Sequence, residues 1–206
     1  VLRSNGALKD IYMADFLKTA REYYFIAPFT LDSVATNPEK TLHDLEKFDL
    51  LLVPKPTEPF TDAQKQVVDQ YIMNGGRALW LIDNVAVSLE DMYKTGGMTM
   101  AMPVNLNLTD MFFQYGFRIN YTLVNDLYFS EIIVATGDGS QTRYMPIPWV
   151  YNPLVISGNN HLINNHLDAV RFQFANSIDT LKNGVKKTVL LASSPFSKAD
   201  GTPREI

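Results

Sequence analysis

The clearest structural signal lies in residues 49–83, which read DLLLVPKPTEPFTDAQKQVVDQYIMNGGRALWLID. The opening run DLLLV is apolar without alternation, which is typical of a strand covered on both faces in a parallel sheet. Thr61 and Gln64 form a capping-box pattern that predicts the start of a helix, and Gly75 stands where a left-handed helix end is expected. Arg77–Asp83 is a second apolar run. Strand, helix and strand in this order predict a βαβ unit with a right-handed crossover.

Upstream of this unit the sequence predicts two helices and one more strand. Ile11–Glu22 has its apolar residues at helical spacing, so an amphipathic helix is expected there. Tyr23–Ala27 (YYFIA) predicts a short buried strand that Pro28 ends. Thr41–Phe48 predicts a short helix that begins at a Thr41 cap. The expected inward face of the first helix consists of Met13, Phe16, Leu17 and Ala20.

Downstream the pattern becomes less regular. Residues 84–103 are predicted to form an irregular excursion, whose four methionines are either core-packed loop side chains or an adaptable surface. Leu108–Tyr115 predicts a short helix. Residues 136–168 form a Pro/Asn-rich insertion in which Asp138–Gly139 predicts a hairpin turn. Further strands are expected at two short runs, Val170–Phe174 and Lys187–Ala192.

These elements predict the fold class and the domain organisation. We expect a single α/β domain over residues 1–206, with a mostly parallel sheet flanked by helices and extra β segments in the C-terminal half. A chain of 206 residues, 46% of them hydrophobic, buries a core without disulfide or metal support.

Composition excludes several classes of protein. The chain has no cysteine, which excludes a disulfide scaffold, a cysteine-ligated zinc site, an iron–sulfur cluster and a cysteine nucleophile. Its net charge is −4 and neither half has a basic excess, which argues against a nucleic-acid partner. The longest stretch without a charged residue, Tyr144–Leu167, contains three prolines and does not predict a membrane-spanning helix. No signal peptide is visible, and a start at Val1 rather than Met indicates a piece of a longer protein.

Ligands of open parallel sheets bind beyond the carboxyl ends of the strands. Lys55, Thr57 and Glu58 follow the first predicted strand, and Asp83 ends the second. These four residues are therefore the candidate ligand-binding residues. The alternative, which sequence position favours, is that Lys55 and Glu58 are solvated turn residues and that Asp83 caps the next segment.

No catalytic, metal or cofactor site emerges from the sequence. Glu58 and Asp83 suit an acid/base pair only if their carboxyls converge. His161 and His166 are five residues apart, a spacing that suits neither a helical nor a strand metal pair. The chain has no GxGxxG, no phosphate-binding P-loop motif and no GxSxG elbow. Trp149 and Tyr151 either stack on a sugar or pack a proline-rich turn onto the core.

The stretch KPTEPFTDAQKQVVDQYIMNGGRALWLID at 55–83 resembles the GldG family, the gliding-motility-associated auxiliary, or substrate-binding, proteins of ABC transporters in Bacteroidetes. Its most specific piece is DQYIMNGG. The resemblance continues through FTLDSVATNPEKTL (29–42), NLNLTDMFFQYGFRIN (105–120), LVNDLY (123–128) and KKTVLLASSPFSK (186–198), and so covers most of the chain.

The resemblance implies an extracytoplasmic, periplasmic domain of a protein held in the inner membrane by helices and partnered with an ABC permease and ATPase. It also implies a fold similar to class I glutamine amidotransferases, of flavodoxin-like type, and to the related domain of intraflagellar transport proteins. The amidotransferase activity does not carry over, because its cysteine nucleophile is missing here. The family supplies no catalytic residues to transfer.

The function expected is therefore that of a non-catalytic auxiliary domain without a cofactor, which acts through protein or ligand contacts within the transporter complex. A small-molecule or glycan ligand remains open. The alternatives are a carbohydrate- or peptide-binding module and a carboxylate-dependent hydrolase on the same fold.

Overall fold

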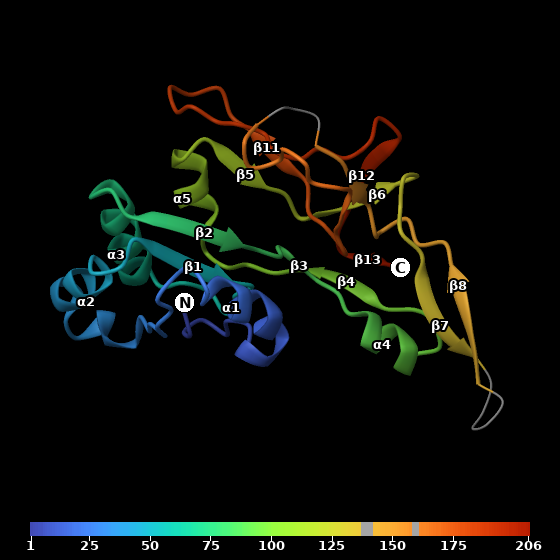
Figure 1. Ribbon diagram of the computed structural model, residues 1–206, viewed down its shortest axis with the longest axis horizontal. Coiled ribbons are helices and arrows are strands. Elements are labelled where there is room, and N and C mark those ends of the chain that lie inside the picture. The colour runs from blue at the N-terminus through green and yellow to red at the C-terminus, as the bar shows by residue number, and fades with distance from the viewer. Residues whose placement is uncertain (137–141, 158–160) are drawn as a thin grey trace. The chain divides into compact units, whose positions relative to one another are not determined.

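The computed structural model describes residues 1–136, 142–157 and 161–206, and the chain forms two compact units (Figure 1). Unit 1 comprises Val1–Asp83 and Val104–Tyr115. Unit 2 comprises Asn84–Pro103 and Gly116–Ile206. The chain therefore leaves unit 1, returns to it for twelve residues and leaves it again. Within the described residues, no helix is long and apolar enough to cross a membrane.

The centre of unit 1 is the predicted βαβ unit. Strands β1 (Leu50–Pro54) and β2 (Arg77–Leu81) pair in parallel, and helix α3 (Asp62–Met73) connects them (Figure 1). The capping box is present, since the Thr61 side chain accepts from Gln64 N and the Gln64 side chain accepts from Thr61 N. Gly75 ends the helix with a φ of 100°. The predicted order of strand, helix and strand is therefore confirmed, and the two strands are parallel as expected.

The core of unit 1 lies between β1 and α3. Leu51, Leu52 and Val53 are buried on β1, and Val68 and Tyr71 on α3 pack inside the same unit. Strand β2 instead alternates between partly buried and exposed residues. The other side of β1 is occupied by the start of the chain, where Leu2 N donates to Leu52 O and Leu2 forms a parallel bridge with Phe29.

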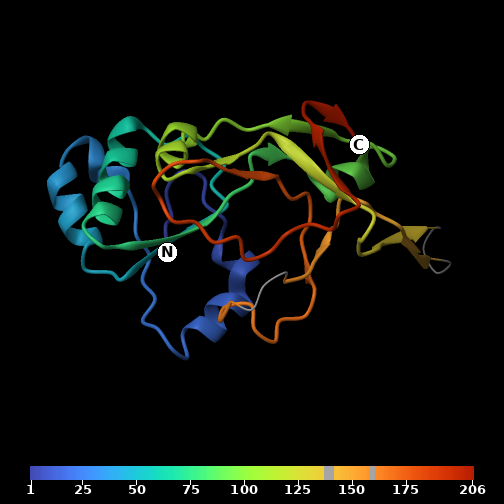
Figure 2. The same cartoon turned by 90° about the horizontal axis from the view of Figure 1, so that it is seen from above.

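The short helices of unit 1 differ from the sequence prediction in where they begin and in which residues cap them. The 3-10 helix η1 (Asp10–Met13) leads into α1 (Ala14–Ala20), and η2 (Asp32–Ala35) precedes α2 (Pro38–Leu45), which lies beside α3 (Figure 2). Asn37, not Thr41, caps α2, because its side chain accepts from Lys40 N. Tyr23–Ala27 is not a buried strand, since Tyr23, Tyr24 and Phe25 are exposed in a turn and an irregular segment.

Unit 2 begins with the segment expected to be irregular, and that expectation is wrong. Residues 84–103 fold into β3 (Val85–Ala86), α4 (Leu89–Lys94) and β4 (Met100–Pro103). Strand β4 lies between β3 and β13 (Arg204–Glu205), and both pairings are antiparallel. Ser88 caps α4, because its hydroxyl accepts from Glu90 N.

The remaining strands of unit 2 form antiparallel pairs. They are β5 (Phe117–Ile119) with β11 (Ile178–Thr180), β6 (Thr122–Asp126) with β12 (Ser197–Gly201), β7 (Ile132–Thr136) with β8 (Arg143–Ile147), and β9 (Leu154–Val155) with β10 (Val170–Arg171). The predicted turn at Asp138–Gly139 falls outside the described residues. The run Lys187–Ala192 forms no strand and contributes only a bridge between Ala192 and Ile156.

A mostly parallel, flavodoxin-like or class I glutamine amidotransferase-like sheet was therefore the wrong expectation. Among the described residues the fold is mixed α/β, and its many small sheets hold two or three strands. In the part of the chain that the structure describes, β1 and β2 alone form a sheet of parallel strands. The physical reason is that an apolar run reports burial, whereas strand direction depends on which distant segment supplies the pairing partner.

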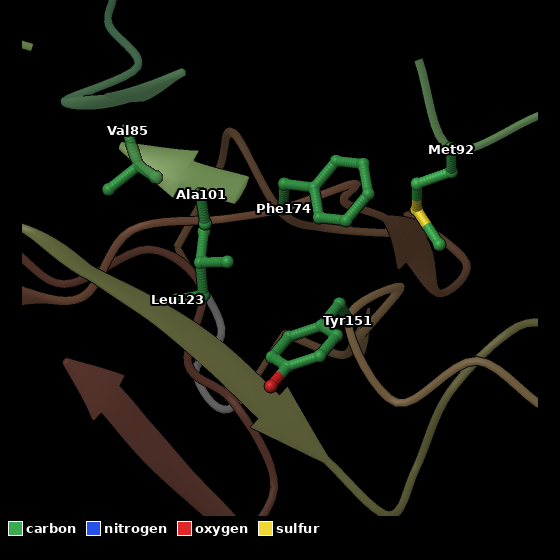
Figure 3. Close-up of a cluster of buried hydrophobic side chains, with 6 residues drawn as sticks. All are labelled: Val85, Met92, Ala101, Leu123, Tyr151 and Phe174. Atoms are coloured by element: carbon green, nitrogen blue, oxygen red, sulfur yellow. The ribbon is translucent and has the colours of Figure 1, made fainter. Parts of the chain in front are cut away.

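The core of unit 2 is an aromatic and aliphatic cluster, shown in Figure 3. Tyr151 and Phe174 lie at its centre with ring centroids 6.5 Å apart, and Met92 of α4 is buried there. Trp149 packs against both rings, at centroid distances of 6.0 and 6.4 Å. Trp149 and Tyr151 thus pack onto the core. Their rings are not exposed as a pair on which a sugar could stack. The other members of the cluster are Val85, Ala101 and Leu123.

Candidate functional site

The strand-end site, consisting of Lys55, Thr57, Glu58 and Asp83, lies where β1 and β2 end. Lys55 directly follows β1 and Asp83 follows β2 by two residues. Because parallel strands end at the same edge, the two side chains meet, and Lys55 Nζ lies 2.8 Å from Asp83 Oδ2. Both side chains are at least one third exposed, so this ion pair contributes about 0–1 kcal/mol. The structure therefore brings two of the four predicted residues into direct contact.

The other two residues are held by the N-terminal loop, Ser4–Leu8. The backbone N–H groups of Thr57 and Glu58 both donate to Asn5 O, at 3.0 and 3.1 Å. The Thr57 hydroxyl donates to Gly6 O at 3.1 Å. The N–H and the hydroxyl of Thr57 are thus bonded within the chain, whereas the Glu58 side chain is exposed.

Sequence reasoning missed this loop, although a signal for it exists. Asn5 and Gly6 form an Asn-Gly pair, which marks tight turns, and both have a positive φ, of 57° and 63°. Asn5 Nδ2 also donates to Pro59 O and to Gln64 Oε1. The loop therefore connects the strand-end site to the first turn of α3.

The acid/base hypothesis for Glu58 and Asp83 gains no support from this geometry. The Asp83 carboxylate pairs with the Lys55 ammonium, and the Glu58 backbone is bonded to the N-terminal loop. No group of three or more His, Asp or Glu residues that could hold a metal ion occurs among the described parts of the chain. The imidazole of His161 accepts from Ile163 N, which is the behaviour of a turn histidine.

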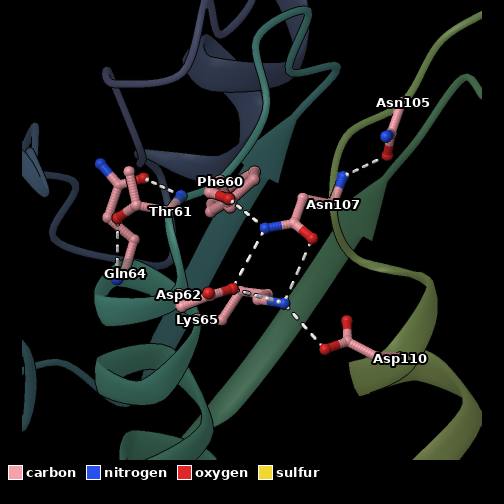
Figure 4. Close-up of polar contacts among 8 residues, drawn as sticks. All are labelled: Phe60, Thr61, Asp62, Gln64, Lys65, Asn105, Asn107 and Asp110. Carbon is pink, nitrogen blue, oxygen red and sulfur yellow. Dashed lines mark hydrogen bonds and ion pairs between the residues drawn. The ribbon is translucent and has the colours of Figure 1, made fainter.

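A second polar arrangement, the Lys65 network, joins α3 to α5 (Thr109–Gln114) and to the segment just before α5, as Figure 4 shows. Lys65 Nζ lies 2.8 Å from Asp110 Oδ2, 3.0 Å from Asp62 Oδ1 and 3.4 Å from Asn107 Oδ1. The Asn107 amide donates to Phe60 O at 2.8 Å and to Asp62 Oδ1 at 3.3 Å. The Lys65 side chain is 11% exposed, whereas both aspartates face solvent.

The charges of this network stabilise one another. Burial lowers the pKa of Lys65, but its hydrogen bonds with Asp110 and Asp62 outweigh burial, so the net shift is upward. The same bonds from Lys65 hold the pKa of Asp62 and of Asp110 below the ordinary carboxyl value. All three groups are therefore charged over a wide pH range, which suits a structural connection rather than proton transfer.

A second bond ties α5 to α3 on the same side. The Tyr115 hydroxyl donates to Asp69 Oδ1 at 2.6 Å. Burial, followed by the neighbouring Asp69 carboxylate, raises the pKa of the Tyr115 phenol well above its ordinary value. Tyr115 therefore stays protonated and acts as a permanent donor between the two helices.

Beside α5 lies an open hollow of about 630 Å³, which we name the α5 hollow. It offers a carboxylate, amides, a hydroxyl and an aromatic face, and the Phe113 ring is 56% exposed. These groups suit a polar, hydroxyl-bearing ligand. The amide of Asn107 and one oxygen of Asp110 are already engaged with Lys65, so the hollow is only partly available. Its lining residues are Asn107, Thr109, Asp110, Phe113 and Gln114.

Among the described residues of unit 2, the carboxylates of Asp126 and Asp200 are buried, and both accept hydrogen bonds within the chain. Asp126 accepts from Tyr128 N, Ser194 N and the Ser194 hydroxyl. Burial raises the pKa of Asp126, but these bonds outweigh it and the net shift is downward. Asp200 accepts from the Tyr151 hydroxyl at 3.0 Å and pairs with Arg204 at 3.2 Å. Neither carboxylate is placed as a general acid or base.

Comparison with known proteins places this geometry in context. A solved structure described as "mmIFT52 N-terminal domain" shares the fold, with a TM-score of 0.61 at 14% sequence identity over 95% of this chain and 72% of that chain. Among curated proteins, none matches the chain. The sequence profile of a family described as "ABC-type uncharacterized transport system" matches residues 1–206. The chain belongs to this family of ABC transport auxiliary domains, and its role is accessory to a transporter.

Proposed function

We propose that this chain is the non-catalytic periplasmic auxiliary domain of an ABC transport complex of the gliding-motility-associated GldG type, and that it works through protein contacts within an assembly that contains permease and ATPase subunits. Family membership over all 206 residues carries the proposal. The geometry supports a non-catalytic role, because the Asp83 carboxylate at the strand-end site is paired with Lys55, and the Asp126 and Asp200 carboxylates of unit 2 are hydrogen-bonded inside the chain.

The association with transporter subunits is tested by affinity purification of the intact, full-length protein from its own membranes. We expect an ABC permease and its ATPase to co-purify in amounts comparable to the tagged protein. The matched control is the same membrane protein with residues 1–206 deleted, from which the subunits are lost. Equal recovery of both subunits with the deleted protein would contradict a role for this domain.

The periplasmic location is tested by thiol labelling, for which a chain without cysteine is well suited. Lys40→Cys places a thiol at an exposed position of α2. In intact cells this thiol is expected to react with a membrane-impermeant maleimide, and the buried Val53→Cys is the unreactive control. Labelling of Lys40→Cys only after cell lysis would place the domain on the other side of the inner membrane.

A second candidate function, binding of a glycan or another hydroxyl-bearing ligand, rests on the α5 hollow. Its volume of about 630 Å³ is in the range of small-molecule sites, and an exposed ring beside a carboxylate and amides is chemistry that sugars use. A panel of mono- and disaccharides should raise the melting temperature if the site is used. Phe113→Ala should abolish the increase, while Phe196→Ala, another exposed phenylalanine, should not. An unchanged melting temperature throughout the panel removes this candidate.

A further inference from the structure

The sequence contains three Asn–Gly pairs, at 5–6, 74–75 and 183–184. An asparagine that precedes glycine is prone to lose its side-chain amide, because the flexible glycine, which has no β-carbon, lets its backbone nitrogen reach the asparagine Cγ. The hydrogen bonds around the three pairs differ, and so the structure predicts a different fate for each.

The pair at 183–184 has hydrogen-bond donors at its side-chain carbonyl. Asn183 Oδ1 accepts from Lys187 Nζ and from Val185 N, the latter at 3.3 Å. Lys187 Nζ also donates to Leu181 O at 2.6 Å, which fixes the ammonium group beside this carbonyl. All these residues belong to unit 2, so the arrangement is built within that unit.

These donors lie where negative charge develops during loss of the amide. When Gly184 N attacks Asn183 Cγ, a new C–N bond forms and an electron pair of the C=O bond moves onto Oδ1. An ammonium group and an N–H bonded to that oxygen stabilise the intermediate, as the donors of an oxyanion hole do. The Cγ–Nδ2 bond then breaks, and ammonia leaves with the proton that Gly184 N loses. Water opens the resulting cyclic imide at either carbonyl, which gives aspartate or isoaspartate at position 183.

The pair at 5–6 lacks these donors. Asn5 is buried, and no residue that the structure describes donates to its Oδ1. Its Nδ2, the group that would leave, donates to Pro59 O at 3.1 Å and to Gln64 Oε1 at 2.9 Å. Both features oppose the reaction, so folding should protect Asn5.

The pair at 74–75 is held at both reacting groups. Gly75 N, which would be the nucleophile, donates to Ile72 O at 3.0 Å. Asn74 Nδ2, which would be the leaving group, donates to Glu46 Oε1 at 2.7 Å. Because attack requires these bonds to break, folding should protect Asn74 as well.

We propose that Asn183 is a site of spontaneous modification in the folded protein, at which Lys187 accelerates the conversion of asparagine to aspartate and isoaspartate. Lys187 contacts the reacting carbonyl and therefore acts as a catalytic residue in this step. The reaction consumes only water. Its product adds one negative charge to a chain whose net charge is −4.

The first test compares the folded chain with the same chain in guanidinium chloride, at mildly alkaline pH in heavy-oxygen water, by peptide mapping with mass spectrometry. In denaturant the three asparagines should react at similar rates, because the surrounding structure is lost. In the folded chain Asn183 should react at least as fast as in denaturant, and Asn5 and Asn74 at least tenfold more slowly. Uptake of the heavy isotope and labelling by an isoaspartyl methyltransferase identify the product.

The second test removes the charged donor. Lys187→Met keeps the aliphatic stem, and the rate at Asn183 in the folded chain should fall about tenfold, as expected for the loss of a charged hydrogen-bond donor. Lys187→Arg should retain most of the rate, since a guanidinium also donates. The matched control is Lys186→Met, which removes the neighbouring exposed charge and should leave the rate unchanged. In denaturant all these variants should react alike, and circular dichroism shows that each is folded in its absence.

Three results would overturn the proposal. The first is an Asn183 that reacts more slowly in the folded chain than in denaturant, because the bonds to Oδ1 would then hold the side chain away from Gly184. The second is an equal rate for Lys187→Met and Lys186→Met in the folded chain. The third is modification of Asn5 or Asn74 as fast as that of Asn183 in the folded chain, since the hydrogen bonds would then not select the site.

Discussion

Lys65 is the residue on which the contact between α3 and α5 depends most. It is almost covered, and it bonds to Asp62, Asn107 and Asp110. Lys65→Met keeps the aliphatic stem but removes the charge, and we expect it to lower the free energy of unfolding by about 1 kcal/mol, because both carboxylate partners are exposed. Urea denaturation measures the change. Lys40→Met, on the exposed side of α2, is the control, and an equal loss in both variants would contradict a specific network.

The same network predicts a pH dependence with a defined sign. The folded pKa values of Asp62 and Asp110 lie below 3.8, so their stabilisation is present above that pH and is lost as the pH falls through the lower folded values. The folded pKa of Lys65 lies above 10.5, so its contribution is present below that pH and is lost as the pH rises further. The difference between wild type and Lys65→Met should therefore be constant near neutral pH and shrink as the pH falls below 3.8. Urea titrations at neutral pH and at a series of pH values below 3.8 decide this.

Gly6 is the residue that lets the N-terminal loop approach the strand-end site. Its φ is 63°, and a β-carbon there would collide with the Thr57 hydroxyl and lie 3.2 Å from Glu58 Cγ. Gly6→Ala should lower the free energy of unfolding by about 1–2 kcal/mol, since the left-handed conformation alone costs this much for a residue with a β-carbon.

Gly184 provides the matched control for this substitution. A β-carbon at Gly184 meets nothing within 4 Å, and its φ is not in the left-handed region. Gly184→Ala should therefore leave the urea midpoint almost unchanged. Equal midpoints for Gly6→Ala and Gly184→Ala would show that the loop does not depend on the conformation of Gly6.

At the scale of elements, α3 depends on its first turn. Thr61 Oγ1 accepts from Gln64 N at 3.2 Å, and Gln64 Oε1 accepts from Thr61 N at 2.9 Å. Thr61→Ala should lower the free energy of unfolding by about 1 kcal/mol, as the loss of a helix cap typically does. Thr30→Ala, at an exposed position outside a helix, is the control. When Gln64 is already replaced by alanine, Thr61→Ala should lower the free energy of unfolding by less than it does in the wild type. The reason is that the two hydrogen bonds form one capping box.

The elements that the sequence predicted best are those whose signals are local. The βαβ unit is encoded by adjacent apolar runs, the Thr61 cap and Gly75, and it forms as predicted. Strand pairing in unit 2 could not be predicted in the same way. Ile178–Thr180 pairs with Phe117–Ile119 some sixty residues earlier, and no local pattern specifies such a partner.

In the candidate site, too, contacts that follow from local patterns were easier to predict than contacts between distant residues. Lys55 and Asp83 were both named as candidates because they follow the two predicted strands, and they form an ion pair. The contact between Lys65 and Asp110 spans 45 residues and was not predicted. The spacing of Asp62 and Lys65 on one helix face was the only local hint of it.

At the scale of the whole molecule, unit 1 is built from two separated segments. The intervening residues 84–103 begin and end as an antiparallel pair, with Val85 opposite Pro103, so the ends that they join lie close together. Replacing residues 84–103 by a Gly/Ser linker of about four residues should therefore allow unit 1 to fold alone. A cooperative urea transition followed by circular dichroism is the expected result.

The control for this variant is the fragment 1–83. It lacks Leu106, whose carbonyl accepts from Phe60 N, and Asp110, the partner of Lys65. This fragment should show no cooperative transition. If the linked variant unfolds no more cooperatively than the fragment, residues 104–115 are not sufficient to complete unit 1.

The late return of residues 104–115 to unit 1 has a consequence for biosynthesis. Asp110 is translated 45 residues after Lys65, and at about 5–20 residues per second this delay lasts several seconds. During that interval the nascent chain already holds α3 and then β2, but not yet α5, whose Phe112 packs against Trp80 of β2. The nascent chain thus exposes apolar surface of unit 1 until residues 104–115 have been made, and this is the stage at which chaperones that bind unfolded chains can act.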